Sequence, residues 1–248
     1  MLERLFTPAT AILMVAACQN QVPEKQPEAA ARERTEESIG SLEGLVKLVG
    51  EDEPEMTRIQ NTTDPEVCGH DHALEDMIIS RENRGIRNVI VALADVPEEK
   101  IPPLVPGHLV VDNTECRFTP HVSVLTVGST IEAINSDPVL HTTHLYGAME
   151  ANISLPIKGA TSLRVAHRPG MIIIKCDIHG WMQGFIRVDP HPFHAVTADD
   201  GSFQISDIPG GTYTLEVWHE KLGPQRKTVH IQSGKAEHIE IQYSFSSN

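Results

Sequence analysis

The chain has 248 residues, of which 34 are acidic and 20 are basic, so its formal net charge is −14 at pH 7. This excess of negative charge excludes nucleic acid as an expected partner, because polyanions bind to basic surfaces. The 13 histidines raise the expectation of a metal or proton site without locating it.

The first 18 residues, MLERLFTPATAILMVAAC, combine a charged start, an apolar run and small residues before a cysteine. They resemble a bacterial lipoprotein signal peptide, in which Cys18 becomes the lipid-bearing first residue of the mature chain. The alternative is an ordinary secretory signal with an incidental cysteine. The resemblance implies the periplasmic side of the cell envelope and a lipid anchor in the outer membrane. Residues 19–39 are rich in Pro, Glu, Gln and Ala and are predicted to be a disordered linker.

Three cysteines remain after such a cleavage. An exported chain meets an oxidising environment, so two of the three are expected to pair. Cys68 and Cys116 are the expected disulfide, because the surroundings of Cys176 indicate another use for that thiol. The alternative for the sequence CGHDH at 68–72 is a metal site, which its turn-forming neighbours make the weaker interpretation.

Beyond the linker, apolar residues come in short runs bounded by Gly, Pro, Asn and Asp, and many runs alternate with period two. The pattern predicts an all-β chain of mainly antiparallel strands in a sandwich or barrel. A helical turn is expected only in 74–85. Strands are predicted at 42–50, 86–96, 108–113, 121–135, 161–167, 170–176, 184–189, 201–208, 211–220 and 227–232.

The sequence CDIHGWM at 176–182 places a thiol, an imidazole and a thioether within seven residues. These are ligands that suit copper, and two histidines, one cysteine and a distant methionine form the trigonal electron-transfer site. A second histidine must then come from another loop at the same end of the strands. The segment INSDPVLHTTH offers His141, with His144 as its rival. Residues three apart on a strand point to opposite faces, so both histidines cannot face one metal.

The order of these motifs resembles the cupredoxins, the plastocyanin-like type 1 copper proteins. The resemblance rests on the strand VGSTIEAIN, the following N…H-x-x-H segment and the C-x-x-H-x-x-M loop, and it covers 118–188. It implies a Greek-key β-sandwich that binds one type 1-like copper ion. Carried over by position, His141, Cys176 and His179 are the equatorial ligands, and Met182 is the axial ligand.

Two residues depart from the cupredoxin pattern. Thr142 stands where most members have an asparagine that steadies the cysteine loop, and Gly180 stands where a proline is common. Both are expected to loosen the surroundings that orient the ligands. His121 is a candidate extra or replacement axial ligand; the alternative is a structural histidine that bonds a loop carbonyl. Zinc is the alternative metal, although methionine is a poor zinc ligand.

The segment TADDGSFQISDIPGGTYTLEVWHEKL, near the C-terminus, resembles the carboxypeptidase regulatory-like, transthyretin-type β-sandwich. That family is a scaffold without a shared chemistry. We expect residues 40–105 and 189–248 to complete one such sandwich, with a copper domain at 106–188 inserted between them. The alternative is three successive β pieces.

These features together predict an envelope protein that carries single electrons to a redox partner such as a cytochrome or dehydrogenase, and that is not an enzyme. His179 is the expected exit edge for electrons. The alternatives are a copper-buffering or delivery lipoprotein without a redox partner, and a structural or carbohydrate-associated β-sandwich protein. An enzyme that uses His121 and an open copper position is the least supported.

Overall fold

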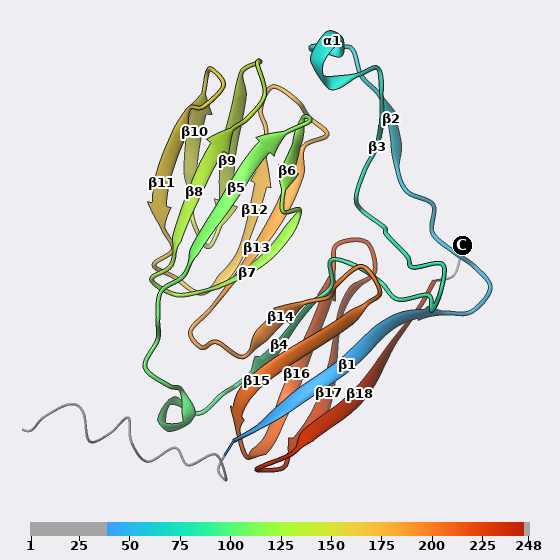
Figure 1. Cartoon of the computed structure of the whole chain (residues 1–248), viewed down its shortest axis with the longest axis vertical. Coiled ribbons are helices and arrows are strands. Elements are labelled where there is room, and N and C mark those ends of the chain that lie inside the picture. Colours follow the sequence, from blue (N-terminus) through green and yellow to red (C-terminus); the bar gives the residue numbers. More distant parts are fainter. Residues whose placement is uncertain (1–38, 246–248) are drawn as a thin grey trace, which may run out of the picture. The chain divides into compact units, whose positions relative to one another are not determined.

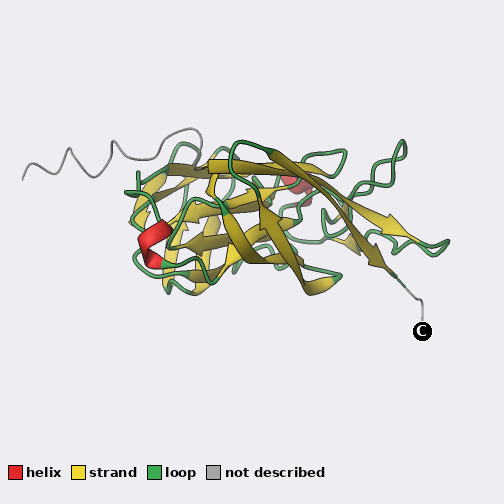
Figure 2. Ribbon diagram, turned by 90° about the horizontal axis from the view of Figure 1, so that it is seen from below, coloured by secondary structure: helices red, strands yellow, loops and turns green. Residues whose placement is uncertain are grey.

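The computed structural model of the protein describes residues 39–245, which Figure 1 traces in colour. The expected signal peptide, Cys18 and all of the expected linker except its last residue lie outside the described residues. Figure 2 shows that the described chain consists of strands and loops with very little helix, so the all-β prediction is confirmed. Within the described part, no helix combines the length and the apolar character needed to cross a membrane.

Strands from the two ends of the described chain build one sandwich, called here the terminal sandwich. One of its sheets has the order β15 (Ser202–Pro209), β1 (Ile39–Val49), β18 (Ala236–Ser244); the other has the order β14 (His194–Val196), β4 (Ile90–Ala94), β16 (Gly211–His219), β17 (Gly223–Ile231). Strand β1 runs parallel to β18 and antiparallel to β15. Strands β1 and β4, which precede residue 95, therefore pair with strands that follow residue 193.

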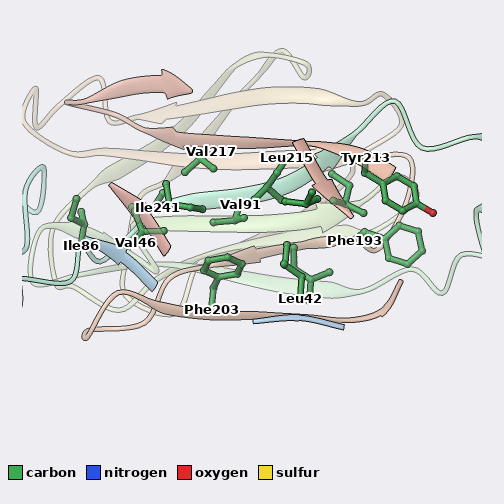
Figure 3. Close-up of a cluster of buried hydrophobic side chains, with 14 of the residues drawn as sticks. Leu42, Val46, Ile86, Val91, Phe193, Phe203, Tyr213, Leu215, Val217 and Ile241 are labelled. Atoms are coloured by element: carbon green, nitrogen blue, oxygen red, sulfur yellow. The ribbon is translucent and has the colours of Figure 1, made fainter. Parts of the chain in front are cut away.

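One apolar core joins the two sheets of the terminal sandwich. In β16, alternate residues Tyr213, Leu215 and Val217 are buried, while the residues between them are not fully buried. Figure 3 shows these side chains meeting Leu42 of β1 and Ile241 of β18 between the two layers. The period-two pattern of the sequence thus becomes one buried face for each strand.

Strands between these two sets form a second sandwich, the central sandwich. One sheet has the order β10 (Ala151–Leu155), β9 (His141–Gly147), β12 (Gly170–Lys175), β13 (Gln183–Asp189), β7 (Val122–Thr126); the other has the order β11 (Thr161–Val165), β8 (Thr130–Asn135), β5 (His108–Thr114), β6 (Arg117–Thr119). Its core includes Phe118, Ile131, Leu145 and Ile172. The β8–β9 turn leads directly to His141, and the β12–β13 loop carries Cys176, His179 and Met182.

The segment between β1 and β4 contains a small hairpin of its own. Residues 51–76, called here the arm, hold β2 (Arg58–Gln60), α1 (Pro65–Cys68) and β3 (Asp71–Ala73), and β2 pairs with β3 antiparallel. Figure 1 shows α1 at the far end of this excursion. A short 3₁₀ turn, η3 (Glu98–Lys100), follows β4.

The helical turn expected in 74–85 is limited to one hydrogen bond, from the Arg84 N–H to the Ser80 carbonyl oxygen at 2.9 Å, and no helix forms there. This stretch instead ends in a tight turn, in which Ile79 bridges Ile86 antiparallel and the Ser80 N–H donates to the Gly85 carbonyl oxygen at 2.8 Å. Met77 and Ile86 are buried in the core of the terminal sandwich, and Ile79 packs against it. Extended backbone suits this packing because residues two apart share one face.

The assigned core can be tested with a substitution that creates a cavity in it. Leu215 is 0% exposed, whereas Leu163 on β11 is 56% exposed. We expect Leu215→Ala to lower the free energy of unfolding by about 2–5 kcal/mol, because the removed methyl groups leave a cavity in a packed core. Leu163→Ala is the matched control and should change it by less than about 0.5 kcal/mol. Urea denaturation of both variants makes the comparison, and equal losses would contradict the assigned core.

Candidate metal centre

The loop between β12 and β13 carries three of the expected ligand residues. Cys176 follows β12 directly, and Met182 directly precedes β13. The Cys176 N–H donates to the Met182 carbonyl oxygen at 3.3 Å, and the Met182 N–H donates to the His179 carbonyl oxygen at 2.9 Å. The loop is therefore closed on itself at the end of the sheet.

The β8–β9 turn at the end of the central sandwich delivers His141. Asn135 ends β8, and its buried side-chain amide donates to the carbonyl oxygens of Val139 and Leu155 at 2.8 and 2.9 Å. The Asn135 Oδ1 accepts the Asp137 N–H at 2.9 Å. One buried amide thus fixes the turn that places His141 at the first position of β9.

The structure brings Cys176, His141 and His179 together. The Sγ of Cys176 lies 3.8 Å from Nδ1 of His141 and 3.7 Å from Nδ1 of His179. The three residues are 4%, 0% and 0% exposed, and their ligand atoms lie within 4.8 Å of one another. Two histidine rings therefore face one buried sulfur.

This donor set fits a transition-metal ion. The sulfur and the two nitrogens are close enough together to contact one ion, because metal–sulfur and metal–nitrogen bonds in proteins are about 2.0–2.3 Å long. One thiolate and two imidazoles are donors for either copper or zinc, and a methionine in the same loop favours copper. Met182 is 2% exposed and belongs to the same apolar cluster as Cys176.

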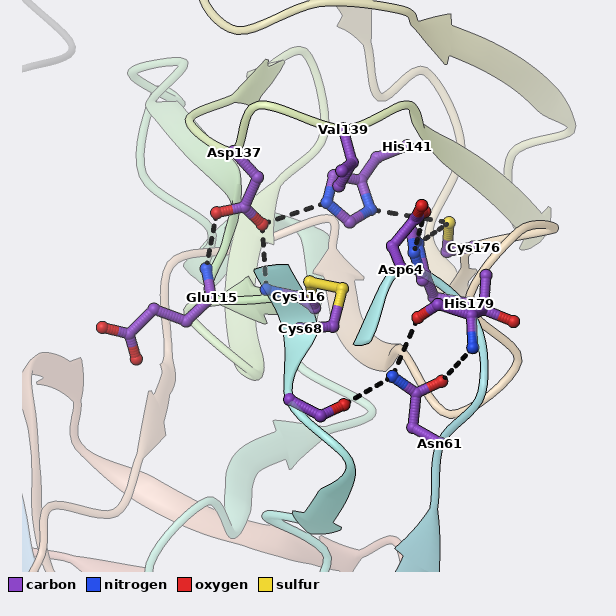
Figure 4. The surroundings of a disulfide bond; sticks show 12 residues. Asn61, Asp64, Cys68, Glu115, Cys116, Asp137, Val139, His141, Cys176 and His179 are labelled. Carbon is purple, nitrogen blue, oxygen red and sulfur yellow. Dashed lines mark hydrogen bonds and ion pairs between the residues drawn. A yellow bond between two sulfur atoms is a disulfide. The ribbon is translucent and has the colours of Figure 1, made fainter. Parts of the chain in front are cut away.

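Each imidazole has a carboxylate on its outer nitrogen, as Figure 4 shows. His141 Nε2 lies 3.0 Å from Asp137 Oδ2, and His179 Nε2 lies 3.1 Å from Asp64 Oδ2. Such partners orient a ligating histidine and fix which ring nitrogen carries the proton. Sequence reasoning did not single out either carboxylate. Asp137 could have been found four residues before His141, but Asp64 lies on the arm and gives no sequence signal.

The surroundings of Cys176 favour its ionised form. Burial alone would raise the pKa of the thiol, but hydrogen bonds with His141, His179 and the Thr142 N–H lower the pKa to about 5. Burial alone would likewise lower the pKa of His179, and the Cys176 sulfur and the Asp64 carboxylate together raise it above its ordinary value. Cys176 is therefore a thiolate at neutral pH, the form that binds metals.

Thr142 contacts the cysteine loop directly, and whether it holds the loop less firmly than an asparagine would stays a prediction. Its N–H donates to the Cys176 Sγ at 3.4 Å, and its hydroxyl lies 3.8 Å from the same sulfur. The hydroxyl also accepts the Asp177 N–H at 2.7 Å. A threonine hydroxyl is short enough to bond the backbone of the neighbouring loop from this position. Gly180 is exposed, with open space where a Cβ would stand.

The two candidate additional histidines are engaged elsewhere. His144 Nδ1 lies 2.9 Å from Asp177 Oδ1 and 2.8 Å from the Tyr146 hydroxyl, whereas His141 is the one that faces Cys176. His121 forms a short contact with the Glu220 carboxylate of the terminal sandwich. Neither belongs to a group of metal-ligand atoms found with Cys176 among the described residues.

The pair Cys68–Cys116 forms a disulfide, which is the pairing expected from the sequence. It joins helix α1 of the arm to the β5–β6 turn of the central sandwich. The outer edge of His179, expected as the exit for electrons, is not open to solvent, because the side chain is 0% exposed and Asp64 lies against it. The arm therefore forms part of the centre.

Comparison with known proteins shows similarity over part of the chain. No family model and no curated protein matches. A reduced amicyanin with a single substitution is 25% identical over 36% of this chain and 96% of that chain, with a TM-score of 0.30. A purple cupredoxin from Nitrosopumilus maritimus is 20% identical over 34% of this chain and 99% of that one, also with a TM-score of 0.30.

A copper-containing nitrite reductase from Thermus scotoductus is similar as well. It is 25% identical over 39% of this chain, with a TM-score of 0.30, and the match spans 25% of the reductase. Similar structures are thus cupredoxins over a partial region of the chain. The side-chain geometry described above is what supports a function.

The lowered pKa of Cys176 is testable in metal-free protein. We expect thiolate absorbance near 240 nm to be present at neutral pH and to disappear with a midpoint at about pH 5 as acid is added. The sign follows from a depressed pKa, because the ionised form persists above about pH 5 and is lost below it. Cys176→Ala should remove the transition. A midpoint between about pH 8 and 9, the ordinary cysteine range, would contradict the assigned environment.

Proposed function

We propose that the protein is a one-electron carrier that binds a single copper ion through His141, Cys176 and His179, with Met182 as the axial ligand. The observation that supports it is the buried triangle of one sulfur and two Nδ1 atoms at 3.8 and 3.7 Å. When bound, copper supplies a couple between Cu(II) and Cu(I). This role transfers electrons without turning over a substrate, so the proposed protein is not an enzyme.

The residues of this chain hold the donors in place and keep water out. All three equatorial side chains are less than 5% exposed, and each imidazole is fixed from behind by a carboxylate. Two backbone hydrogen bonds close the cysteine loop, and Thr142 ties it to β9. Donors fixed in this way would need little movement of the protein when a bound ion changed its charge.

The rest of the chain would place this centre in the cell envelope. We propose that residues 106–188 are the copper domain and that 40–105 and 189–248 form a carboxypeptidase regulatory-like scaffold around it. The pairing of β1 with β15 and β18 supports the split scaffold. Acylation of Cys18 would anchor the chain to the outer membrane on its periplasmic side. The electron partner would be another redox protein, such as a cytochrome or dehydrogenase.

Titration with Cu(II) tests the proposal. We expect the purified protein to bind one equivalent and to develop an intense visible sulfur-to-copper band that ascorbate bleaches reversibly. Cys176→Ser should abolish the band, because the thiolate is the donor of that transition. His144→Ala is the matched control for His141→Ala, since only His141 faces the sulfur. The His144→Ala variant should keep the band.

Two outcomes would count against an electron carrier. Copper binding at one equivalent without the visible band would favour a copper-buffering or delivery protein. Preference for Zn(II) over copper in a competition experiment would favour a structural zinc site. Persistence of the band in Cys176→Ser would overturn the ligand assignment itself.

A further inference from the structure

Asp64 occupies an unusual place on the arm. It stands at the N-cap position of α1, yet its side chain makes no capping hydrogen bond to that helix. Its backbone has φ 48° and ψ 45°, the left-handed region that residues other than glycine seldom adopt. An aspartate at this position ordinarily bonds the first N–H groups of its helix. Here its carboxylate instead lies 3.1 Å from Nε2 of His179.

The surrounding contacts fix Asp64 in this orientation. The Asn61 side chain is buried and donates to the carbonyl oxygens of Thr63 and Gly69, both at 2.8 Å, so it closes the loop that contains Asp64. The Cys68 N–H donates to the Asp64 carbonyl oxygen at 2.8 Å. The loop is therefore closed on both sides of the carboxylate.

The arm is also fastened to the central sandwich at two points. The disulfide joins Cys68, four residues after Asp64, to Cys116. The His72 ring stacks on Trp181 of the cysteine loop, with centroids 4.6 Å apart and an angle of 23° between the planes. The Trp181 Nε1–H donates to the Cys116 carbonyl oxygen at 3.1 Å. These contacts restrict how far the arm can move away from His179.

We propose that Asp64 is a positioning residue for His179, supplied to the centre from outside the central sandwich, and that the Cys68–Cys116 disulfide holds it there. By accepting a hydrogen bond from Nε2, the carboxylate turns the other ring nitrogen, Nδ1, toward the Cys176 sulfur. It also covers the imidazole edge, so the fully buried ring keeps a partner for its outer nitrogen.

The two histidines of the centre differ in the origin of their partners. Asp137 lies in the same turn as His141, and it also accepts the backbone N–H groups of Glu115 and Cys116, both at 2.9 Å. His141 therefore receives its carboxylate from its own sandwich. His179 receives its carboxylate from a segment 115 residues away. The two half-cystines hydrogen-bond the residues that partner the two imidazoles, since the Cys116 N–H bonds Asp137 and the Cys68 N–H bonds Asp64.

The role inferred for Asp64 rests on the proposed copper site, but the position of its carboxylate can be tested in metal-free protein. Diethyl pyrocarbonate acylates accessible imidazole nitrogens, and peptide mass spectrometry locates the product. We expect Asp64→Gly to raise the rate of His179 modification about ten- to a hundredfold, the factor for loss of one hydrogen bond to a charged group. Glycine takes the left-handed backbone without strain, so the variant removes the carboxylate and spares the turn.

Asp64→Asn is the conservative variant. Asparagine also tolerates the left-handed region, and its amide oxygen can still accept a hydrogen bond from Nε2. We expect it to restore most of the protection of His179. Glu66→Gln is the matched control, because Glu66 is an exposed carboxylate on the same arm, and it should react like the unaltered protein. His144, at a partly exposed position, serves as an internal reference for reagent strength.

A second variant tests the clamp. Cys68→Ser combined with Cys116→Ser keeps Asp64 but removes the covalent link, and we expect it to expose His179 as Asp64→Gly does. Protection of His179 in Asp64→Gly equal to that of the unaltered protein would overturn the positioning role. Protection retained in the double serine variant would overturn the clamping role.

Metal release separates this inference from the proposed function. For Cu(II)-loaded protein, we expect Asp64→Gly to release the ion to a chelator about 10 to 100 times faster, with Asp64→Asn close to the unaltered protein. If no variant binds copper, the proposed function fails while the modification result still decides the position of Asp64. If copper binds and release is unchanged in Asp64→Gly, the positioning role fails while the copper site stands.

Discussion

A buried thiolate is the constraint around which this end of the molecule is built. An ionised sulfur removed from water is costly unless hydrogen-bond donors surround it. Cys176 meets that requirement with the imidazoles of His141 and His179, but the second nitrogen of each ring is then buried as well. Asp137 and Asp64 satisfy those nitrogens. Each buried polar group thus needs a partner that is itself held in place. Backbone N–H groups hold Asp137, and the arm with its disulfide holds Asp64.

The pairing of the β-strands brings two of these residues together. Strands β9 and β12 pair antiparallel, so His141 at the start of one strand and Cys176 just beyond the end of the other meet at the same edge of the sheet. Neighbouring strands lie about 4.8 Å apart, close enough for side chains on them to share one ion. The apolar core beneath, which includes Leu145 and Ile174, excludes water from that edge.

Features that depend on neighbouring residues could be predicted from the sequence, whereas contacts between distant segments could not. Alternating apolar residues predict the strands, and the spacing of Cys176, His179 and Met182 predicts one loop that brings them together. His141 and His144 lie three residues apart on a strand, so they are predicted to point to opposite faces. Their spacing does not say which of them faces the sulfur. The contribution of Asp64 has no such signal, because a contact across 115 residues depends on how two sandwiches and an arm pack. The disulfide was predicted by counting cysteines, but its position beside the metal centre was not predicted.

The arm also bears on whether the central sandwich is a separable module. Residues 106–188 contain every expected copper ligand, and they could be mistaken for a self-sufficient unit of the kind that evolution moves between proteins. Excised from the rest, that unit would leave Cys116 as an unpaired thiol beside the centre and His179 with a bare outer edge. The segment that completes the centre is encoded before the unit begins. Duplication or transplantation of the ligand-bearing region alone would therefore transmit the ligands without the complete site.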